Sequence, residues 1–586
     1  MKAHRKGGIP KSSKNQSQTA IARPAEEASA SHPVTTAGFF AIFASALVAG
    51  WLAFLPSLSG PFIFDDFGLP FADPRAASMP PSFWIGGVRR MLMASYWLNF
   101  ALWDQNPLSY HVVNLCLHAL ATVFVCLCAL SLLKAAGIAE SRQRILAIFV
   151  SGIFLLHPLQ TESVDYIAGR SEVLTGVFYF AAFAVFLQAL RSEIGFGRVL
   201  AILALFGAAT LSKEHAVTLP VLLAFTGIYW NESGRQHIRR GARLYAVLAA
   251  GAVVAAAVTF RLLATAASAG FGMKNVRWYQ YFLTQCRVVP NYLRLFIVPA
   301  GQNADWGLPF DHGLFDHGDV YYLLAICIAI GLAIRYRRRA PLLCYGFLVF
   351  LLLLAPTSTV VPIKDAMAER RMYLPIFGLA IAAAGLLASL KLTGRNLTLL
   401  VVVVLTLAGA LSYRRSEVWT SEVVLWRDVV SKSPANVRAY RALGAALVKA
   451  NECGEAIRAY QTAVILFRTQ PGDEFDMRLP LASAYLCSQE RAAARAVLHD
   501  LSSPEAAKMY DDLGILSAKD GDLQQALRDF NDAIRIDPNN SDAYAHRGLS
   551  ELAKGDAQAA EGDCRHSLSL NPGNGGAQEC LRQMHQ

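Results

Sequence analysis

Residues 397–413, LTLLVVVVLTLAGALSY, form an uncharged apolar run, and the segment that follows, RRSEVWTSEVVLWRDVV (414–430), is charged and amphipathic. Apolar runs of roughly 16 to 24 residues, the length that crosses a bilayer as a helix, recur up to this point. Amphipathic helical patterns fill the remainder. A chain of 586 residues that is 54% hydrophobic is too long and too apolar for one soluble domain. The predicted fold class is therefore all-α, with a polytopic transmembrane helical domain followed by a soluble helical domain.

The apolar segments predict about eleven membrane spans. They lie at about 38–58, 110–133, 145–158, 171–190, 197–212, 216–231, 243–264, 319–335, 341–356, 372–389 and 397–413. Short loops rich in Lys and Arg, such as 134–144 and 335–339, are predicted to face the cytoplasm. An odd number of spans then places the C-terminal domain on the outer side.

Residues 278–299 are nearly long enough to form a further span, but they contain Arg287, Pro290, Asn291 and Arg294. Charged side chains are costly in hydrocarbon. The segment is therefore interpreted as an interfacial or re-entrant helix on the outer side.

The first 35 residues are polar and basic, which predicts a disordered cytoplasmic tail. The run at 38–58 is long for a signal-peptide core and has no clear small-residue cleavage site, so it is interpreted as a membrane anchor. The net charge is +11, but the basic residues cluster in the tail and the short loops, where orientation in the membrane explains them. Nucleic-acid binding is not predicted. The predicted domains are the tail (1–35), the membrane domain (36–415) and the C-terminal domain (416–586).

The C-terminal domain contains a helical repeat. Tyr544 follows Tyr510 after one period of about 34 residues, the length of a tetratricopeptide (TPR) repeat. Small and aromatic residues recur at the repeat positions, among them Leu513, Gly514, Ala526, Phe530, Ala533, Pro538, Gly548, Ala560 and Pro572. Earlier units begin near Tyr440 and Leu481. The predicted TPR α-solenoid offers a concave surface that suits a protein or peptide segment.

The cysteines show no metal-ligand spacing, and those in the apolar runs are interpreted as small buried side chains. Cys564 and Cys580 lie in the repeats. They are a candidate disulfide if that domain faces an oxidising compartment.

Two adjacent aspartates, Asp65 and Asp66, follow the first apolar run in the stretch PFIFDDF (61–67). Like charges this close resist joint ionisation. A carboxylate beside the bilayer is also what a transferase uses to take a proton from an acceptor hydroxyl. The alternative is the ordinary use of Asp in a turn or helix cap.

The predicted topology places a set of mixed charges on the outer side, as an active site at that surface requires. The alternative is interfacial anchoring, which would use Lys, Arg, Trp and Tyr on both faces. The set comprises Asp65, Asp66, Asp104, Glu162, Asp165, Arg170, Glu172, Lys213, Glu214, His215, Lys364, Asp365, Glu369, Arg370 and Arg371.

Two groups of histidines accompany these charges. His111, Asn114 and His118 share one helical face by their spacing, which predicts interhelical hydrogen bonds, with substrate contact as the alternative. His157 and Glu162 have a spacing that could bring two metal ligands together, but Pro158 interrupts the helix, so no metal site is predicted. Phosphate-binding glycine loops and nucleophile elbows are absent from the sequence.

Several of these stretches together resemble the transmembrane-and-TPR-containing (TMTC) protein O-mannosyltransferases and their bacterial relatives, within the GT-C class of glycosyltransferases. The resembling stretches are FDDF (64–67), HVVNLCLHAL (111–120), LHPLQTESV (156–164) with GRSE (169–172), LSKEH (211–215) and AERRMYLP (368–375). The resemblance extends from about residue 38 to the end and includes the order of membrane domain and repeats. It departs at 369–373, where relatives typically have one arginine and this chain has Arg370 and Arg371.

The resemblance implies an integral-membrane glycosyltransferase. It would move a sugar, mannose by analogy, from a polyprenyl-phosphate-linked donor to Ser or Thr hydroxyls of proteins on the outer face, with inversion. The lipid-phosphate sugar would be the donor substrate and the TPR groove would hold the acceptor. The expected location is the bacterial inner membrane with the repeats in the periplasm, or the endoplasmic reticulum facing the lumen. The alternative function is a non-catalytic membrane scaffold whose repeats recruit envelope proteins.

The resemblance also implies roles for single residues. One aspartate of the pair Asp65 and Asp66, by analogy Asp65, is expected to be the base, and its neighbour to hold the acceptor or a divalent cation. Arg, Lys and His side chains would bind the donor phosphate and stabilise it as it leaves, or alternatively pair with lipid headgroups and neighbouring acids. The phosphate-binding candidates are Arg170, Lys213, His215, Arg370 and Arg371. The supporting residues are His111, Asn114, His118, His157, Glu162, Glu172, Glu214 and Glu369.

Overall fold

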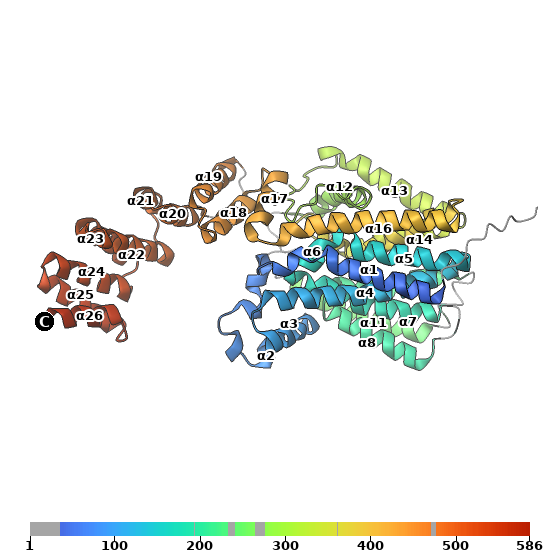
Figure 1. Ribbon diagram of the computed structural model, residues 1–586, viewed down its shortest axis with the longest axis horizontal. Coiled ribbons are helices and arrows are strands. Elements are labelled where there is room, and N and C mark those ends of the chain that lie inside the picture. The colour runs from blue at the N-terminus through green and yellow to red at the C-terminus, as the bar shows by residue number, and fades with distance from the viewer. Residues whose placement is uncertain are drawn as a thin grey trace, which may run out of the picture.

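The computed structural model describes residues 35–190, 192, 194–231, 239, 241–263, 276–359, 361–469 and 476–585. In these residues a long helical bundle is followed by a curved row of paired helices that extends from one end of the bundle (Figure 1). The described residues are helical or irregular and form no β-strand. Except for residue 35, the predicted N-terminal tail lies outside the described residues.

Each predicted span coincides with a helix of the bundle. These helices are α1 (Thr36–Ala53), α4 (Pro107–Ala135), α5 (Glu140–Leu156), α7 (Arg170–Gln188), α8 (Phe196–Thr210), α9 (Leu219–Trp230), α11 (Ala242–Leu263), α13 (Asp319–Tyr336), α14 (Pro341–Leu354), α15 (Ile376–Ser389) and α16 (Gly394–Ser416). Long apolar runs form helices here because they satisfy their own backbone hydrogen bonds within the segment.

The predicted number of spans is wrong. Among the described residues, 5 helices are long and apolar enough to cross a membrane, or 6 if α5 and the bent segment Pro158–Asp165 count as one span. Other bundle helices are shorter: α14 has 14 residues, which at about 1.5 Å per residue covers about 21 Å of a core about 30 Å thick. Turns at Pro158 and Pro375 shorten helices that the apolar pattern continues through.

Helix α12 (Trp278–Ile297) lies on the segment predicted to be interfacial or re-entrant, and it is not among the helices that could span a membrane. Its side chains bind the loop between α14 and α15. The hydroxyls of Tyr281 and Tyr292 donate to the carbonyls of Thr357 (2.5 Å) and Ala368 (2.8 Å). The amide of Gln285 donates to Ala366 at 2.8 Å. The polar residues of α12 therefore hold this loop in place.

The two ends of the bundle differ in chemistry. At the end away from the repeats, Arg142 donates to the carbonyl of Ala388 (3.0 Å), and Tyr229 donates to that of Pro341 (2.8 Å). These contacts join the basic loops that were predicted to share one side. At the opposite end, where the repeats begin, Asp65, Glu162, Asp365 and Arg370 line one pocket together with residues of α17 and α18.

The repeat domain consists of short helices packed in antiparallel pairs. They are α17 (Glu422–Lys432), α18 (Val437–Lys449), α19 (Cys453–Thr469), α20 (Arg478–Cys487), α21 (Arg491–Leu498), α22 (Pro504–Lys519), α23 (Leu523–Ile536), α24 (Ser541–Lys554), α25 (Ala557–Leu570) and α26 (Gly575–Met584). A side chain at Gly514 would place its Cβ 2.5 Å from the ring of Phe530. The glycine therefore permits the close approach of the paired helices.

Two disulfides join helices of the repeats. Cys564 pairs with Cys580, as predicted. Cys453 pairs with Cys487, which was not predicted. The second pair is hard to see in the sequence because its partners stand 34 residues apart, at the start of α19 and the end of α20.

Candidate active site at the junction of bundle and repeats

A pocket of about 320 Å³ lies where the bundle meets the first repeat helices. Its walls come from the turn at 64–67, the 162–166 and 365–370 segments, the loop that contains Ala304, the turn at Trp419 after α16, and helices α17 and α18. The lining residues are Phe64, Asp65, Phe67, Glu162, Tyr166, Ala304, Asp365, Arg370, Trp419, Glu422, Trp426, Arg438, Arg441, Ala442, Ala445 and Lys449. Sequence-predicted residues from three separate motifs thus meet in one cavity.

The two aspartates of the pair have opposite environments. Asp65 is exposed and lines the pocket, and its backbone N–H donates to the hydroxyl of Tyr166 at 2.8 Å. Asp66 is fully buried. The turn that carries both aspartates begins at Phe64, which lies in the left-handed region (φ 50°), a conformation that costs a non-glycine residue about 1–3 kcal/mol. The ring of Phe64 packs on Trp426 of α17, with 4.5 Å between ring centroids.

The buried Asp66 joins two turns of the backbone. Its Oδ2 accepts the N–H of Ile63 at 2.9 Å, and its Oδ1 accepts the N–H of Ala168 at 2.8 Å. Burial raises the pKa of Asp66 to about 7, although both N–H bonds favour the ionised form. The structure does not place Asp66 in the pocket, because its carboxylate is used to hold the turn that presents Asp65.

Arg370 and Arg371 diverge. The backbone N–H of Arg370 donates to Glu162 at 2.9 Å, its guanidinium pairs with the same carboxylate, and it lies 3.7 Å from Asp365. Its side chain is 27% exposed on the pocket wall. Arg371 instead donates to the carbonyl of Ala366 (3.0 Å) and to the hydroxyl of Tyr281 (3.2 Å). The structure brings Arg370 to Asp65 but turns Arg371 toward the protein backbone.

A second charged cluster centres on Glu172 at the start of α7. Lys213 Nζ lies 2.5 Å from its Oε1, and His215 Nε2 lies 3.4 Å from its Oε2. The neighbouring Glu214 forms a two-pronged ion pair with Arg89, at 2.8 and 2.9 Å. These bonds fix the turn between α8 and α9 against both α7 and the segment that contains Arg89.

The two charged regions influence each other. Burial lowers the pKa of Lys213, the charge of Glu172 opposes the shift, and the charges of Arg89 and Arg370 add to it. Lys213 and His215 have side chains only 17% and 10% exposed. Lys213 is thus a largely buried amine balanced by Glu172, with His215 beside it, and Arg370 is near enough to affect the pKa of Lys213.

Arg170 is buried away from the pocket. It donates to the side-chain oxygens of Asn114 (2.7 Å) and Asn99 (2.8 Å), and its guanidinium lies over the ring of Tyr96, 4.6 Å from the centroid. Another bond of 3.0 Å goes to the carbonyl of Tyr110. These contacts make Arg170 the centre of a polar core that joins α3 (Arg90–Trp103), α4 and α7.

The three histidines predicted as supporting residues all bind backbone or side-chain groups of other segments. His111 hydrogen-bonds with the carbonyl of Gly60 at 3.1 Å, and His118 with the hydroxyl of Tyr373 at 2.9 Å. His157 hydrogen-bonds with the carbonyl of Phe296 at 3.0 Å. They connect α4 and the end of α5 to Gly60, Tyr373 and helix α12, and none of the three lines the pocket.

Glu369 is buried behind the pocket wall. Its carboxylate accepts the N–H of Asn303 at 2.5 Å. Burial raises the pKa of Glu369 to about 8, while Arg415 acts against the shift. Arg415 itself pairs with Asp428 of α17 at 2.8 Å. Glu369 thus supports the contact between bundle and repeats.

The repeat side of the pocket was missed by the sequence reasoning. Arg438, Arg441, Ala442, Ala445 and Lys449 all line the pocket from α18. Their spacing of three, four, seven and eleven residues from the first is that of one helical face. This spacing could have identified a polar face on α18, but the sequence offers no signal that the face turns toward Asp65.

No family model matches the sequence. The chain is 23% identical over 444 residues to the protein O-mannosyl-transferase F38B6.6 of Caenorhabditis elegans, covering 71% of this chain and 61% of that protein. It is 22% identical over 544 residues to the human protein O-mannosyl-transferase TMTC3, covering 83% of this chain and 56% of that protein. The chain therefore spans less than two thirds of the length of these relatives.

A stretch of 216 residues, 34% of this chain and 24% of the relative, is 30% identical to the protein O-mannosyl-transferase Tmtc1 of Drosophila melanogaster. Among solved structures, ArnT from Cupriavidus metallidurans bound to undecaprenyl phosphate covers 80% of this chain and 82% of its own, with 15% identity and a TM-score of 0.38. Over much of its length, the chain is thus a relative of the TMTC protein O-mannosyl-transferases, the family that its motifs resemble.

Proposed function

We propose that this chain is an integral-membrane glycosyltransferase that moves a sugar, mannose by analogy with its relatives, from a polyprenyl-phosphate-linked donor to Ser or Thr hydroxyls of proteins. The observation that carries the proposal is the placement of Asp65, an exposed carboxylate in a pocket that it shares with Arg370. A base and a cation in one cavity are the two groups that such a transfer needs. The names of the relatives support the same reaction class.

Asp65 is proposed to act as the base. The acceptor hydroxyl gives its proton to the carboxylate as its oxygen forms a bond to the anomeric carbon of the sugar. The bond from that carbon to the carrier phosphate breaks, and the phosphate leaves with the electron pair. No covalent enzyme intermediate is required, so the configuration at the anomeric carbon inverts.

Arg370 is proposed to stabilise the leaving phosphate, because a guanidinium offers two parallel donors to phosphate oxygens. Its pairing with Glu162 fixes the guanidinium at the pocket wall. Lys213 and His215 are proposed as a second phosphate contact that would exchange Glu172 for the donor. Arg170 and Arg371 are assigned structural roles, because neither lines the pocket and their donors bind other groups of the protein.

A divalent cation beside Asp65 does not fit the residues present. Among the described residues, no three His, Cys, Asp or Glu side chains gather as metal ligands. The nearby Glu162 is paired with Arg370. The proposed mechanism therefore routes no step through a metal.

The proposed location is the bacterial inner membrane, with the pocket and repeats facing the periplasm. The two disulfides of the repeat domain support an oxidising compartment. The contacts between basic loops at the far end of the bundle support the cytoplasm on that side. The acceptor would then reach the pocket from the aqueous side, along the repeats.

The test is Asp65→Asn, assayed with polyprenyl-phosphate mannose and a library of Ser- and Thr-containing peptides. Loss of the base is expected to lower the rate of transfer by about 10²–10⁴-fold. Asp104→Asn is the matched control, because Asp104 is also exposed but lies outside the pocket lining. Wild-type transfer by Asp65→Asn refutes the mechanism. Capture of envelope proteins without any transfer by the wild type supports the scaffold alternative.

A further inference from the structure

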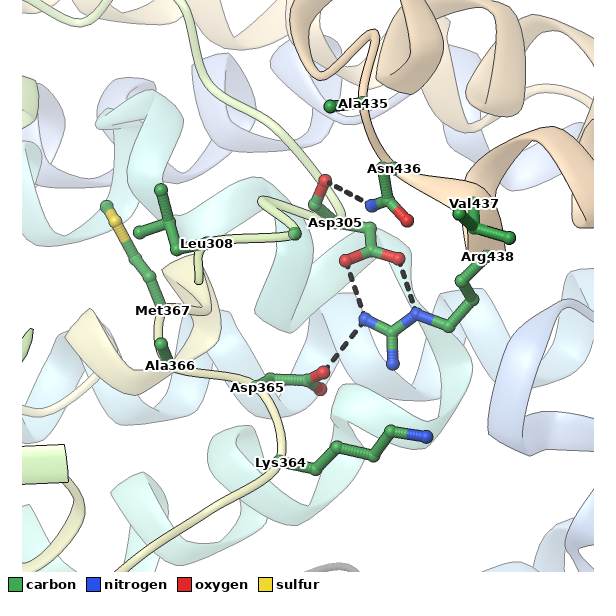
Figure 2. A pocket seen from close by; sticks show the side chains of 11 residues that line it. Asp305, Leu308, Lys364, Asp365, Ala366, Met367, Ala435, Asn436, Val437 and Arg438 are labelled. Atoms are coloured by element: carbon green, nitrogen blue, oxygen red, sulfur yellow. Dashed lines mark hydrogen bonds and ion pairs between the residues drawn. The ribbon is translucent and has the colours of Figure 1, made fainter. Parts of the chain in front are cut away.

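Arg438 of α18 joins two loops of the membrane domain. Its Nε and Nη2 atoms donate to the carboxylate of Asp305, at 2.7 and 2.6 Å, and Nη2 also donates to Asp365 at 2.8 Å (Figure 2). Figure 2 shows the guanidinium between the two acids, which approach it from separate loops. Bidentate pairs of this kind fix orientation as well as distance.

Asp365 is shared between the repeat domain and the proposed reaction centre. One oxygen accepts from Arg438, and the other lies 3.7 Å from Nη2 of Arg370. Burial raises the pKa of Asp365, but Arg438 and Arg370 outweigh it and hold the pKa below its usual range. The acid is therefore an ionised link between one arginine in the repeats and one in the bundle.

The contact around Arg438 is closely fitted. Asn303 donates to the hydroxyl of Ser433 at 2.8 Å, and that hydroxyl donates to the carbonyl of Trp306 at 3.0 Å. Gly307 adopts a left-handed conformation (φ 55°), and a Cβ there would lie 2.8 Å from the amide nitrogen of Asn436. The loop at 303–307 thus has little room to shift relative to α18.

We propose that Arg438 is a positioning residue of the transferase: through Asp305 and Asp365, helix α18 holds Arg370 where the donor phosphate would leave. This inference rests on the proposed function and extends it, because it makes the repeat domain part of the reaction centre. Displacing a charged group by about 1 Å can cost up to roughly 100-fold in rate. We call the contacts of Arg438 with Asp305 and Asp365 the clamp. Loss of the clamp should therefore lower kcat.

Asp305→Asn is the sharper variant, because Asp305 binds Arg438 but does not line the pocket with Asp65. Both Asp305→Asn and Arg438→Gln are expected to lower kcat by roughly 10- to 100-fold, and Asp305→Asn should leave the KM for the acceptor peptide unchanged. The double variant should lose no more than the worse single variant, because both break the same clamp. Arg438→Lys should recover part of the rate, since it keeps the charge without the fork.

Arg427→Gln is the matched control. Arg427 also pairs with two carboxylates, Glu452 and Glu455, but all three lie within the repeats. It should have wild-type kcat. Wild-type kcat in Asp305→Asn and Arg438→Gln overturns the inference, as does an equal loss in Arg427→Gln.

Hydrogen exchange of residues 363–371 provides a readout independent of transfer. The two clamp variants should exchange faster than the wild type in this segment, and Arg427→Gln should not. Unchanged exchange in the clamp variants overturns the inference even if their kcat falls. If Asp65→Asn transfers normally, the proposed function fails, and exchange alone decides whether Arg438 holds the loop. If Asp65→Asn is inactive but the clamp variants are normal, only the positioning role fails.

Discussion

Replacing Asp66 by alanine is expected to weaken the turn that carries Asp65, and to do so more at pH 5 than at pH 7. The carboxylate accepts the N–H groups of Ile63 and Ala168. Alanine leaves both donors without that acceptor. An unpaired buried donor costs about 1–3 kcal/mol, so the loss amounts to about 2–6 kcal/mol.

The burial of the Asp66 carboxyl has the opposite effect on stability, because burial disfavours the ionised form. Burial raises the pKa of Asp66 from 3.8 to about 7, so the folded state holds the proton more tightly than the unfolded chain. The protonated form of Asp66 therefore stabilises the folded state relative to the ionised form. This stabilisation is complete below pH 3.8 and is lost as the pH rises through 7. At 1.36 kcal/mol per pKa unit, relative to the protonated state, keeping the carboxyl buried costs about 4 kcal/mol at pH 7 and about 2 kcal/mol at pH 5. Alanine removes this cost. The two effects nearly cancel at pH 7, and a net loss of about 2 kcal/mol remains at pH 5.

Hydrogen exchange of the segments 61–68 and 166–169 measures the effect, after correction for the intrinsic rate at each pH. The protection lost on replacing Asp66 should be about 30-fold greater at pH 5 than at pH 7, which corresponds to about 2 kcal/mol. Asp65→Ala is the control: it should abolish transfer and leave protection unchanged, because Asp65 is exposed. An equal loss of protection at both pH values refutes the argument from the buried charge. No loss at either pH refutes the structural role of Asp66.

Two further predictions concern the pocket walls. Ala445→Trp, on the face of α18 that lines the pocket, should fill part of the cavity and raise the KM for acceptor peptides, while any slow hydrolysis of the lipid-linked sugar by water should continue. An equal loss of peptide transfer and of hydrolysis would contradict the idea that this face contacts the acceptor. Arg370→Lys should lower kcat by about 10-fold or more, because it removes the fork that would bind phosphate. Arg371→Lys should instead lower thermal stability, since Arg371 binds Ala366 and Tyr281, and a larger kcat loss in that variant reverses the two assignments.

The apolar pattern predicted where the bundle helices lie but not how many could span a membrane. A run of apolar residues indicates burial in lipid or in protein alike, and α15, which is too short to be counted as a span, lies largely inside the bundle. Helix ends depend on turns that hydropathy does not record. The segment predicted at 372–389 begins as the helix α15 only at Ile376, after Pro375. The repeat pattern was a more specific predictor of helix packing, because a glycine such as Gly514 is required where the ring of Phe530 packs closely against its helix.

The candidate site could be predicted only in part, because its decisive contacts link distant segments. Sequence spacing cannot tell which of two adjacent aspartates faces outward, since that depends on the left-handed Phe64. It cannot tell Arg370 from Arg371 either, because their partners, Glu162 and Tyr281, come from other elements. Arg170 resembled a phosphate ligand by charge and motif. Its burial between Asn99 and Asn114 depends on how separate helices pack, which the sequence pattern does not show.

The repeat domain contacts both halves of the proposed chemistry. On the side of the base, Trp426 packs on Phe64, the residue whose strained backbone directs Asp65 into the pocket. On the side of the leaving group, Arg438 holds Asp365 beside Arg370. A strained conformation persists only where its surroundings hold it. If the repeats moved, the base and the phosphate-binding arginine would lose their supports together. Under the proposed function, the same helices that would receive a polypeptide from the aqueous side would therefore also set the geometry for a donor arriving through the membrane, which would couple acceptor delivery to the assembly of the reaction centre.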